Sequence, residues 1–362
     1  MSDAQLPATG PRVLSGAAFA PPPVAAGMPG GVHGAPAGAT TALSSADVAW
    51  FAETFVRLTG NVSQRIQGKA DQVSYALICL ISEGHLLLED VPGVGKTSLA
   101  RALAESISGS WKRVQFTPDL LPSDVTGSSI YRQNTGEFEF RKGPVFANIV
   151  IGDEINRASP KTQSSLLEVM EERQVTVDGE TQLVPRPFVV IATQNPIEMD
   201  AGTYSLPEAQ LDRFLLKMSM GYPDAAAEAG IVTARHGGSP GPLSAVVSVE
   251  EIQRMIKLSS SVRTDPQIVS YAVSVVQSTR QTADVKLGAS PRGSIGLLRA
   301  AQTLAAAESR AYVIADDIKR LAVPVLAHRL IVSPEAQLRG ITAERVIVDL
   351  LNRVAVPGGV VA

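Results

Sequence analysis

Cysteine is nearly absent from this chain of 362 residues, which contains only one, Cys79. A single cysteine excludes a disulfide framework within the chain and is typical of proteins from a reducing compartment. Cys79 lies in the apolar run YALICLI, so we interpret it as a core residue rather than a nucleophile. The thiol therefore indicates no redox or covalent chemistry.

Long apolar and targeting segments are missing as well. No uninterrupted apolar stretch reaches the roughly 20 residues that a transmembrane helix needs. The first residues, MSDAQLPATG, lack the basic and hydrophobic regions of a signal peptide. These absences predict a cytoplasmic protein without a membrane span.

An excess of positive charge is also lacking, since the formal net charge is −3 at pH 7. Proteins that bind nucleic acid usually carry a basic patch, or a basic segment interleaved with aromatic residues. We find no such segment, although bulk charge does not exclude a local basic patch. The composition therefore argues against nucleic acid as a partner.

Charged side chains are almost absent from the N-terminal segment, where only Asp3 and Arg12 precede Asp47. This segment is rich in Ala, Gly and Pro and shows no amphipathic period. It cannot bury enough apolar surface to offset the entropy of ordering. We expect a disordered tail over residues 1–43, with a docking arm for a partner as the alternative.

The remaining residues divide into two patterns, and the chain length also favours two domains. From Ser45, helical periodicity alternates with short buried runs: HLLLED, RVQFT, ANIVIGDE and PFVVIATQN. Such alternation predicts an α/β fold with a parallel sheet covered on both faces. After residue 225 the pattern is mostly helical. We predict an α/β core over residues 44–225 and a smaller helical domain over residues 226–362.

Two hairpins are predicted within the α/β core. IYRQNTGEFEF has Asn134, Thr135 and Gly136 as its turn. QVTVDGETQLV alternates around Asp178 and Gly179, which is a strong hairpin signal.

The stretch LLLEDVPGVGKTSLARAL has a strand, a glycine-rich loop and a helix in the order of a phosphate-binding loop. Gly93 and Gly95 would let backbone N–H groups face phosphate oxygens, and the helix N-terminus adds partial positive charge. Lys96 would bind the β- and γ-phosphates, and the Thr97 hydroxyl would take Mg²⁺. The predicted nucleotide-binding residues here are Asp90, Val91, Pro92, Gly93, Val94, Gly95, Lys96, Thr97 and Ser98.

Asp90 stands where the full phosphate-loop pattern has its first glycine. Aspartate is among the residues that tolerate a left-handed backbone. We therefore expect Asp90 to turn the strand into the loop.

Two further strands end in polar residues. Asp153 and Glu154 follow ANIVIG and would lie at the carboxyl edge of the sheet, where open α/β sheets bind ligands. Asp153 is expected to hold Mg²⁺ and Glu154 to polarise the attacking water. Asn195, at the end of the next buried strand, could orient that water.

These motifs resemble those of the AAA+ ATPases, and more narrowly of the MoxR family. The resemblance rests on LLLEDVPGVGKTSLARALA, FTPDLLPSDVTG, GPVFANIVIGDEINRASPKTQSSLLEVMEERQVTVDG, ATQNPIEMDAGTYSLPEAQLDRF and GASPRGSIGLL. It covers roughly Gln64 to Leu298, in the order that the family has. One departure is Gly152, where related sequences often have alanine, and we expect it to change strand packing rather than chemistry.

The resemblance implies a five-stranded core with a helical lid, assembled as a ring that is usually hexameric, with nucleotide between neighbouring subunits. Lys96 and Thr97 then match Walker A, Asp153 and Glu154 match Walker B, and Asn195 falls on sensor 1.

The resemblance also assigns residues outside these three motifs. Arg213 falls on the arginine finger that reaches the neighbour's γ-phosphate, and Arg292 on sensor 2, the lid arginine over the bound nucleotide. Gly68 corresponds to the segment near the adenine ring. The hairpin VTVDGETQLV looks like the insert in helix 2 that MoxR shares with magnesium chelatase, which can line the pore or its rim. Arg157 is left open between a structural and an intersubunit role.

The family further implies an ATP-driven, chaperone-like remodeller that matures a partner protein or inserts its cofactor. Such members commonly work with a partner that bears a von Willebrand factor A domain. Two alternatives stay open: a nucleic-acid motor on the same core, and a nucleotide-gated scaffold that barely hydrolyses ATP.

Overall fold

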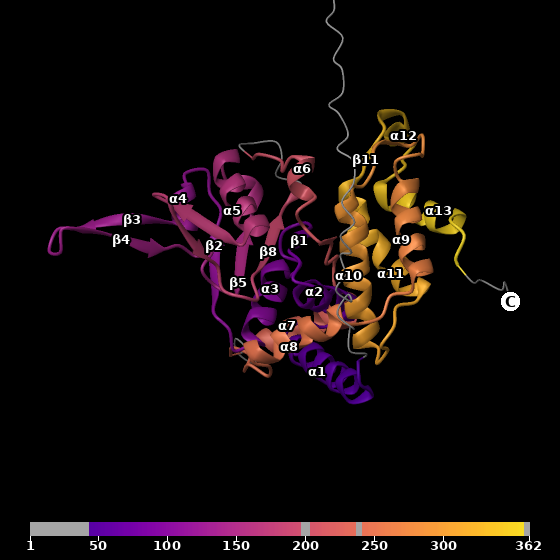
Figure 1. The fold of residues 1–362 in the computed structure, drawn as a ribbon, viewed down its shortest axis with the longest axis horizontal. Helices are drawn as coiled ribbons and strands as arrows, with labels where there is room; N and C mark the ends of the chain where they lie inside the picture. Colours follow the sequence, from indigo (N-terminus) through magenta and orange to yellow (C-terminus); the bar gives the residue numbers. More distant parts are fainter. Residues whose placement is uncertain (1–42, 197–202, 237–240, 358–362) are drawn as a thin grey trace, which may run out of the picture. The chain divides into compact units, whose positions relative to one another are not determined.

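The computed structural model describes residues 43–196, 203–236 and 241–357, which Figure 1 shows as a coloured ribbon. The tail predicted over residues 1–43 lies outside these ranges except for Leu43. Within these ranges, none of the helices has the length and apolar character that crossing a bilayer requires.

A five-stranded parallel sheet forms the α/β part, with the strand order β2-β5-β8-β1-β9. Its strands are β1 Leu86–Glu89, β2 Trp111–Gln115, β5 Ile149–Asp153, β8 Val189–Gln194 and β9 Leu216–Met218. The chain leaves β1 toward the β2 edge, returns through β5 and β8, and crosses over β1 to reach β9. Ligands bind beyond the carboxyl ends of strands where the order reverses in this way, which here is beside β1 and β8. The predicted parallel sheet is confirmed.

Alternate residues of the central strands face two separate hydrophobic clusters. Leu86 and Leu88 belong to a cluster with α1, α2 and α3, whereas Leu87 faces a second cluster with α5. These helices are α1 Ser45–Ser63, α2 Ala70–Ile81, α3 Lys96–Glu105 and α5 Pro160–Glu172. Helices therefore cover both faces of the sheet, as the wholly apolar strands predict.

The residues after β9 are mainly helical. The helices are α7 Ala225–His236, α8 Val249–Ser260, α9 Pro266–Ser278, α10 Pro291–Ala307, α11 Ala315–Leu326, α12 Pro334–Leu338 and α13 Ala343–Arg353. Two short antiparallel strands, β10 Val285–Leu287 and β11 Ile331–Val332, pair within this region. α10 packs against α1 and α2 as well as α8, α9 and α11, so one apolar cluster joins the helical region to the sheet. The boundary at residue 225 stays a prediction.

Both predicted hairpins are present. One consists of β3 Gly127–Arg132 and β4 Glu137–Lys142, and the other of β6 Gln174–Val177 and β7 Glu180–Leu183. At the turn of the second hairpin, Asp178 has φ 53° and Gly179 has φ 83°. Two consecutive positive φ values are what a tight two-residue hairpin turn requires.

The family assignment of the second hairpin was wrong. The short helix α4 Pro122–Thr126 follows β2, and β3 begins directly after it at Gly127. The hairpin inserted at the second core helix is therefore β3–β4, which extends away from the sheet in Figure 1. β6–β7, which contains VTVDGETQLV, comes one helix later, after α5 and before β8. Similar turn chemistry in the two hairpins does not distinguish their places in the chain order.

Two buried histidines tie the sheet to its covering elements. His85, just before β1, lies 3.0 Å from the Met170 carbonyl through Nε2, and its Nδ1 accepts from Val190 N at 3.0 Å. His328 Nε2 lies 3.0 Å from the Phe214 carbonyl. Burial lowers the pKa of each histidine to about 3, and nearby guanidinium groups contribute.

The histidines predict a loss of stability in mild acid. Because each folded-state pKa lies below the unfolded value of about 6.5, the stability they contribute is complete above pH 6.5 and is lost as pH falls toward 3. At pH 5 each histidine should cost about 2 kcal/mol of unfolding free energy. The urea midpoint of the wild type should fall between pH 7 and pH 5, and His85→Gln should flatten this dependence. Equal wild-type midpoints at the two pH values would contradict the prediction.

Candidate active site

The loop after β1 has the geometry of an anion site. Gly93 has φ 84° and Gly95 has φ 95°, and an added Cβ at either would meet no atom within 4 Å. α3 begins at Lys96 with Gly95 as its N-cap and no side chain capping it. The first backbone N–H groups of a helix have no partner within the helix, so they can donate to a phosphate.

Lys96 lies folded against this loop. Its ammonium group donates to the carbonyl oxygens of Asp90 and Val91, the latter at 3.1 Å. These carbonyls hold the charge beside the open helix N-terminus, which is where the sequence predicts the β- and γ-phosphates.

Asp90 does not adopt the left-handed backbone that we expected, since it is not among the residues with positive φ. Its carboxylate acts as an anchor instead. Oδ1 accepts from Val91 N at 2.7 Å, and Oδ2 accepts from Ser219 Oγ and Gly221 N, each at 2.6 Å. Burial alone would raise the pKa of Asp90, but these hydrogen bonds outweigh it and lower the pKa. Asp90 therefore fastens the start of the loop to the segment after β9.

Asp90→Gly restores the glycine of the phosphate-loop pattern, yet we expect it to weaken ATP binding about tenfold. A hydrogen bond to a charged group contributes about 1.5–3 kcal/mol, and this change removes the three that anchor the loop. If loss of the anchor costs binding the equivalent of about one such bond, the affinity falls roughly tenfold. The measurement is titration of the variant with ATP. Asp178→Gly is the matched control, because Asp178 has φ 53° and glycine suits that backbone. If Asp90→Gly bound ATP as the wild type does, Asp90 would be only a tolerated turn residue.

Asp153 lies buried at the end of β5 and gathers three donors. Its Oδ1 accepts from Thr97 Oγ1 at 3.0 Å and from Thr193 Oγ1 at 3.2 Å, and its Oδ2 accepts from Arg113 Nε at 2.6 Å. A hydroxyl beside a carboxylate suits Mg²⁺, which takes one or two protein oxygens together with substrate phosphates. In the described ranges, no three acidic, histidine or cysteine side chains gather where they could hold a metal ion without a nucleotide. Mg²⁺ binding by Thr97 and Asp153 stays a prediction.

Glu154, directly after Asp153, has a left-handed backbone with φ 56°. Its Oε2 accepts from Gln115 Nε2 at 2.8 Å and from Arg157 Nη1 at 2.9 Å, and its backbone N donates to Thr193 Oγ1 at 3.1 Å. To polarise a water, this carboxylate would have to exchange one of these bonds for the water. Arg157 therefore contacts the predicted catalytic glutamate within its own chain.

Arg113, Gln115 and Thr193 are site residues that sequence reasoning missed. Arg113 and Gln115 alternate along β2, where Gln115 pairs with Asp153 in register, and Thr193 is on β8, which pairs with the other side of β5. Arg113 and Gln115 are two positions apart in RVQFT, and this spacing indicates that their side chains lie on the same face of the strand. Only the strand order shows that this face adjoins the acidic pair.

Asn195 is buried one residue beyond β8, and its carbonyl oxygen accepts from Asn156 Nδ2 at 3.4 Å. β8 lies between β1 and β5, so Asn195 follows the strand that separates the phosphate loop from the acidic pair. This position agrees with the prediction that it orients a water, a role that stays a prediction.

Gly68 lies between α1 and α2 with φ 68°, and an added Cβ would come 3.1 Å from Ala227 Cβ. The residues around it line a cavity of about 750 Å³. Lys69 Nζ donates to the Tyr222 carbonyl at 2.8 Å, while Gly221 N donates to Asp90. The segment after β9 thus links the cavity at Gly68 to the phosphate loop, which suits the predicted place of an adenine ring.

Arg213 and Arg292 lie at the opposite edge of the sheet. Arg213 precedes β9, Arg292 is in the first turn of α10, and both form ion pairs with Glu171 near the end of α5. They share a cavity of about 280 Å³ with Gly84 and His85, which come before β1. The phosphate loop follows the other end of β1, and a strand of four residues spans about 13 Å.

Arg292 was expected over the bound nucleotide, and in the structure it stands beside Arg213 because α10 begins near the amino edge of the sheet. Its contact with a nucleotide stays a prediction. The structure brings the Walker residues together at one edge and the two arginines together at the other.

Comparisons with known proteins agree with this arrangement. The family described as "ATPase family associated with various cellular activities (AAA)" matches residues 85–216, and the AAA lid domain matches residues 277–350. Chaperone MoxR1 of Mycobacterium tuberculosis is 42% identical over 338 residues, covering 91% of this chain and 89% of that protein. YeaC of Bacillus subtilis is 52% identical over 298 residues, covering 82% of this chain and 93% of that protein.

A solved structure of a protein from Cytophaga hutchinsonii has a TM-score of 0.80 at 36% identity, and the match covers 86% of this chain and 97% of that chain. The sheet, the phosphate loop and the helical region thus occur together in relatives that match most of the chain. The chain belongs to the MoxR family of AAA ATPases.

Proposed function

We propose that this chain hydrolyses ATP to ADP and phosphate in a site that two copies complete together. The observation that carries the proposal is the separation of its parts. Lys96, Thr97, Asp153 and Glu154 gather at the carboxyl edge of the sheet, whereas Arg213 lies beyond the other end of β1. An arginine finger for the γ-phosphate then comes from another copy.

Each group at the carboxyl edge has a chemical task in this proposal. The backbone donors that follow Gly93 and the Lys96 ammonium bind the phosphates, and Thr97 and Asp153 would hold Mg²⁺. The metal ion would neutralise charge on the β- and γ-phosphate oxygens. Glu154 accepts a proton from the attacking water, and Asn195 orients that water.

The same geometry supports a ring. An interface between the phosphate loop of one copy and Arg213 of the next joins two different surfaces, and such head-to-tail contacts close into rings. We propose a hexamer, as the family resemblance implies. Arg292, beside Arg213, would face the neighbour's nucleotide as well.

We further propose that hydrolysis drives chaperone-like remodelling, maturation or cofactor insertion in a partner protein. A relative that is 42% identical bears the name chaperone MoxR1, which supports this class of activity. A partner with a von Willebrand factor A domain fits the family resemblance. The one cysteine, Cys79, is buried and forms no disulfide within the chain, which suits the cytoplasm that we propose.

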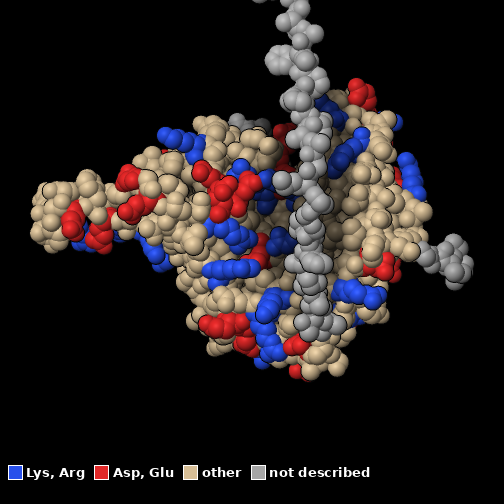
Figure 2. Space-filling view, viewed as in Figure 1, with Lys and Arg blue, Asp and Glu red and all other residues tan. Residues whose placement is uncertain are grey.

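A nucleic-acid motor is the second candidate and is less well supported. On the face shown in Figure 2, basic side chains are interspersed with acidic ones. Steady-state ATP turnover with and without DNA or RNA tests it. We expect equal rates, and stimulation by nucleic acid would favour the motor. A wild type that turns over ATP no faster than Glu154→Gln would instead favour a scaffold.

The partner is best sought with the Glu154→Gln variant, which should hold ATP without hydrolysing it. A client that binds this variant in ATP and leaves it in ADP would support remodelling. Equal retention in both nucleotides would count against a nucleotide-driven cycle.

A further inference from the structure

Two arginines from different parts of the chain meet on one carboxylate, that of Glu171. Arg213 Nη2 lies 3.1 Å from Glu171 Oε2, and Arg292 contacts the other oxygen, Oε1. Glu171 is one residue from the end of α5, and its side chain is 34% exposed. The carboxylate therefore bridges two guanidinium groups at a surface that solvent reaches.

The cavity of about 280 Å³ that Arg213 and Arg292 share is lined by more basic than acidic side chains. Its lining includes five arginines and three acids: Arg173, Arg213, Arg292, Arg299 and Arg329, with Glu83, Glu171 and Asp212. The local balance is therefore positive, which attracts an anion.

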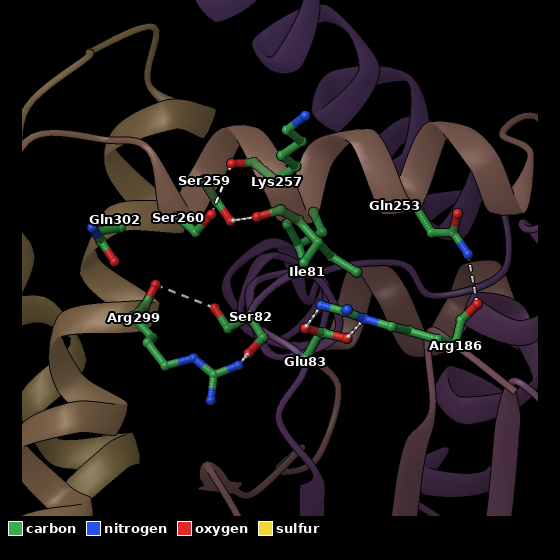
Figure 3. A pocket seen from close by; sticks show the side chains of 11 residues that line it. Ile81, Ser82, Glu83, Arg186, Gln253, Lys257, Ser259, Ser260, Arg299 and Gln302 are labelled. Carbon is green, nitrogen blue, oxygen red and sulfur yellow. Dashed lines mark hydrogen bonds and ion pairs between the residues drawn. The ribbon is translucent and has the colours of Figure 1, made fainter. Parts of the chain in front are cut away.

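The other two acids are already engaged. Figure 3 shows the Glu83 carboxylate turned toward Arg186, whose Nε and Nη2 each donate to it at 2.8 Å. Asp212 contacts the buried Arg329 and accepts from Ser290 Oγ at 2.9 Å. Arg292 Nη1 is 3.9 Å from Asp212, at the outer limit of an ion pair. Glu171 is thus the main counter-ion for both Arg213 and Arg292.

Glu171 does not satisfy every donor of the Arg213 guanidinium, which it contacts through Nη2. Arg213 Nε is buried and has no hydrogen-bond partner among the described residues. A carboxylate offers two oxygens to two guanidinium forks, whereas a terminal phosphate offers three and carries more charge. A phosphate can therefore replace Glu171 on the same pair of arginines.

We propose that Glu171 is an intramolecular stand-in for phosphate. It holds Arg213 and Arg292 together while no nucleotide lies opposite, and the γ-phosphate of ATP bound to a second copy of this chain displaces it. Glu171 is then a positioning residue that competes with nucleotide. This inference rests on the proposed function, because it takes Arg213 to act on a neighbour's nucleotide.

Competition of this kind has a definite kinetic signature. An intramolecular rival raises the apparent Kd, which equals the intrinsic Kd divided by the fraction of subunits that the rival leaves free, and it does not change the fully assembled site. Removing the Glu171 charge should therefore lower the KM for ATP and leave kcat unchanged. Because both ion pairs are partly exposed, we expect a decrease of about three- to tenfold in KM.

The test compares wild type with Glu171→Gln, which keeps the shape of the side chain and removes its charge. Glu172→Gln is the matched control, since Glu172 is the next residue on α5, is exposed and forms no ion pair among the described residues. We expect a lower KM with kcat within twofold for Glu171→Gln, and wild-type values for Glu172→Gln. In a Glu154→Gln background, Glu171→Gln should also assemble at a lower ATP concentration.

An unchanged or raised KM for Glu171→Gln would overturn the inference. So would a kcat that falls tenfold or more, because Glu171 would then be needed within the assembled site. A wild type without turnover above Glu154→Gln would contradict the proposed function instead. The assembly measurement would still test the competition in that case, because it needs no hydrolysis.

Discussion

Glu154→Gln should lower ATP turnover about 10²- to 10⁴-fold and leave ATP affinity within about threefold of wild type. The carboxylate lies at the end of β5, next to the Asp153 that contacts Thr97, so it is placed to accept a proton from a water at the γ-phosphate. An amide of the same shape cannot accept that proton. Its oxygen can still accept the hydrogen bonds from Gln115 and Arg157, so the local structure should persist.

The measurement pairs single-turnover hydrolysis with ATP titration of the same preparation. Glu168→Gln is the control, since Glu168 is an exposed carboxylate on α5 whose loss should leave both quantities unchanged. Loss of binding in Glu154→Gln would mean that Glu154 supports the nucleotide rather than the chemistry. Full turnover would exclude it as the base.

Arg213→Ala should lower turnover about 10³-fold or more while ATP binding is retained, because an arginine finger contributes to the transition state. The phosphate loop should be unaffected, since Arg213 lies beyond the other end of β1. The ion pair with Glu171 is partly exposed, and its loss should cost little stability. Arg213→Lys should not restore turnover, because a lysine lacks the planar fork that grips two phosphate oxygens.

Arg345→Ala provides the control for Arg213→Ala. Arg345 is 68% exposed, and within the described part of the chain its one ion pair is with Asp349 on its own helix, so turnover should stay at the wild-type rate. If Arg213→Ala kept wild-type turnover, the finger would be another residue, with Arg292 as the next candidate.

The sheet and the phosphate loop could be predicted from the sequence because their signals are local. Short apolar runs such as Leu86–Leu88, bounded by turn residues, favour strands buried on both faces, and two glycines before a helix mark the loop. Asp153 and Glu154 were found in the same way, as polar residues at the end of an apolar strand.

Contacts between distant residues could not be predicted. Asp90 anchors the loop to Ser219 and Gly221, which follow it by more than a hundred residues, so its own backbone preference was a misleading guide. Arg292 lies where the packing of α10 against the core places it, which its local motif does not determine. In both cases tertiary contacts set the position.

Mixing subunits tests most directly the claim that two copies complete one site. Arg213→Ala keeps Glu154, and Glu154→Gln keeps Arg213, so each variant alone should be inactive. Random mixing in one ring should restore about a quarter of the wild-type turnover, because one interface in four joins an intact Glu154 to an intact Arg213. Mass photometry of size-tagged subunits would show whether mixed rings form. If they do form and turnover stays at the sum of the two separate variants, the claim of a composite site is contradicted.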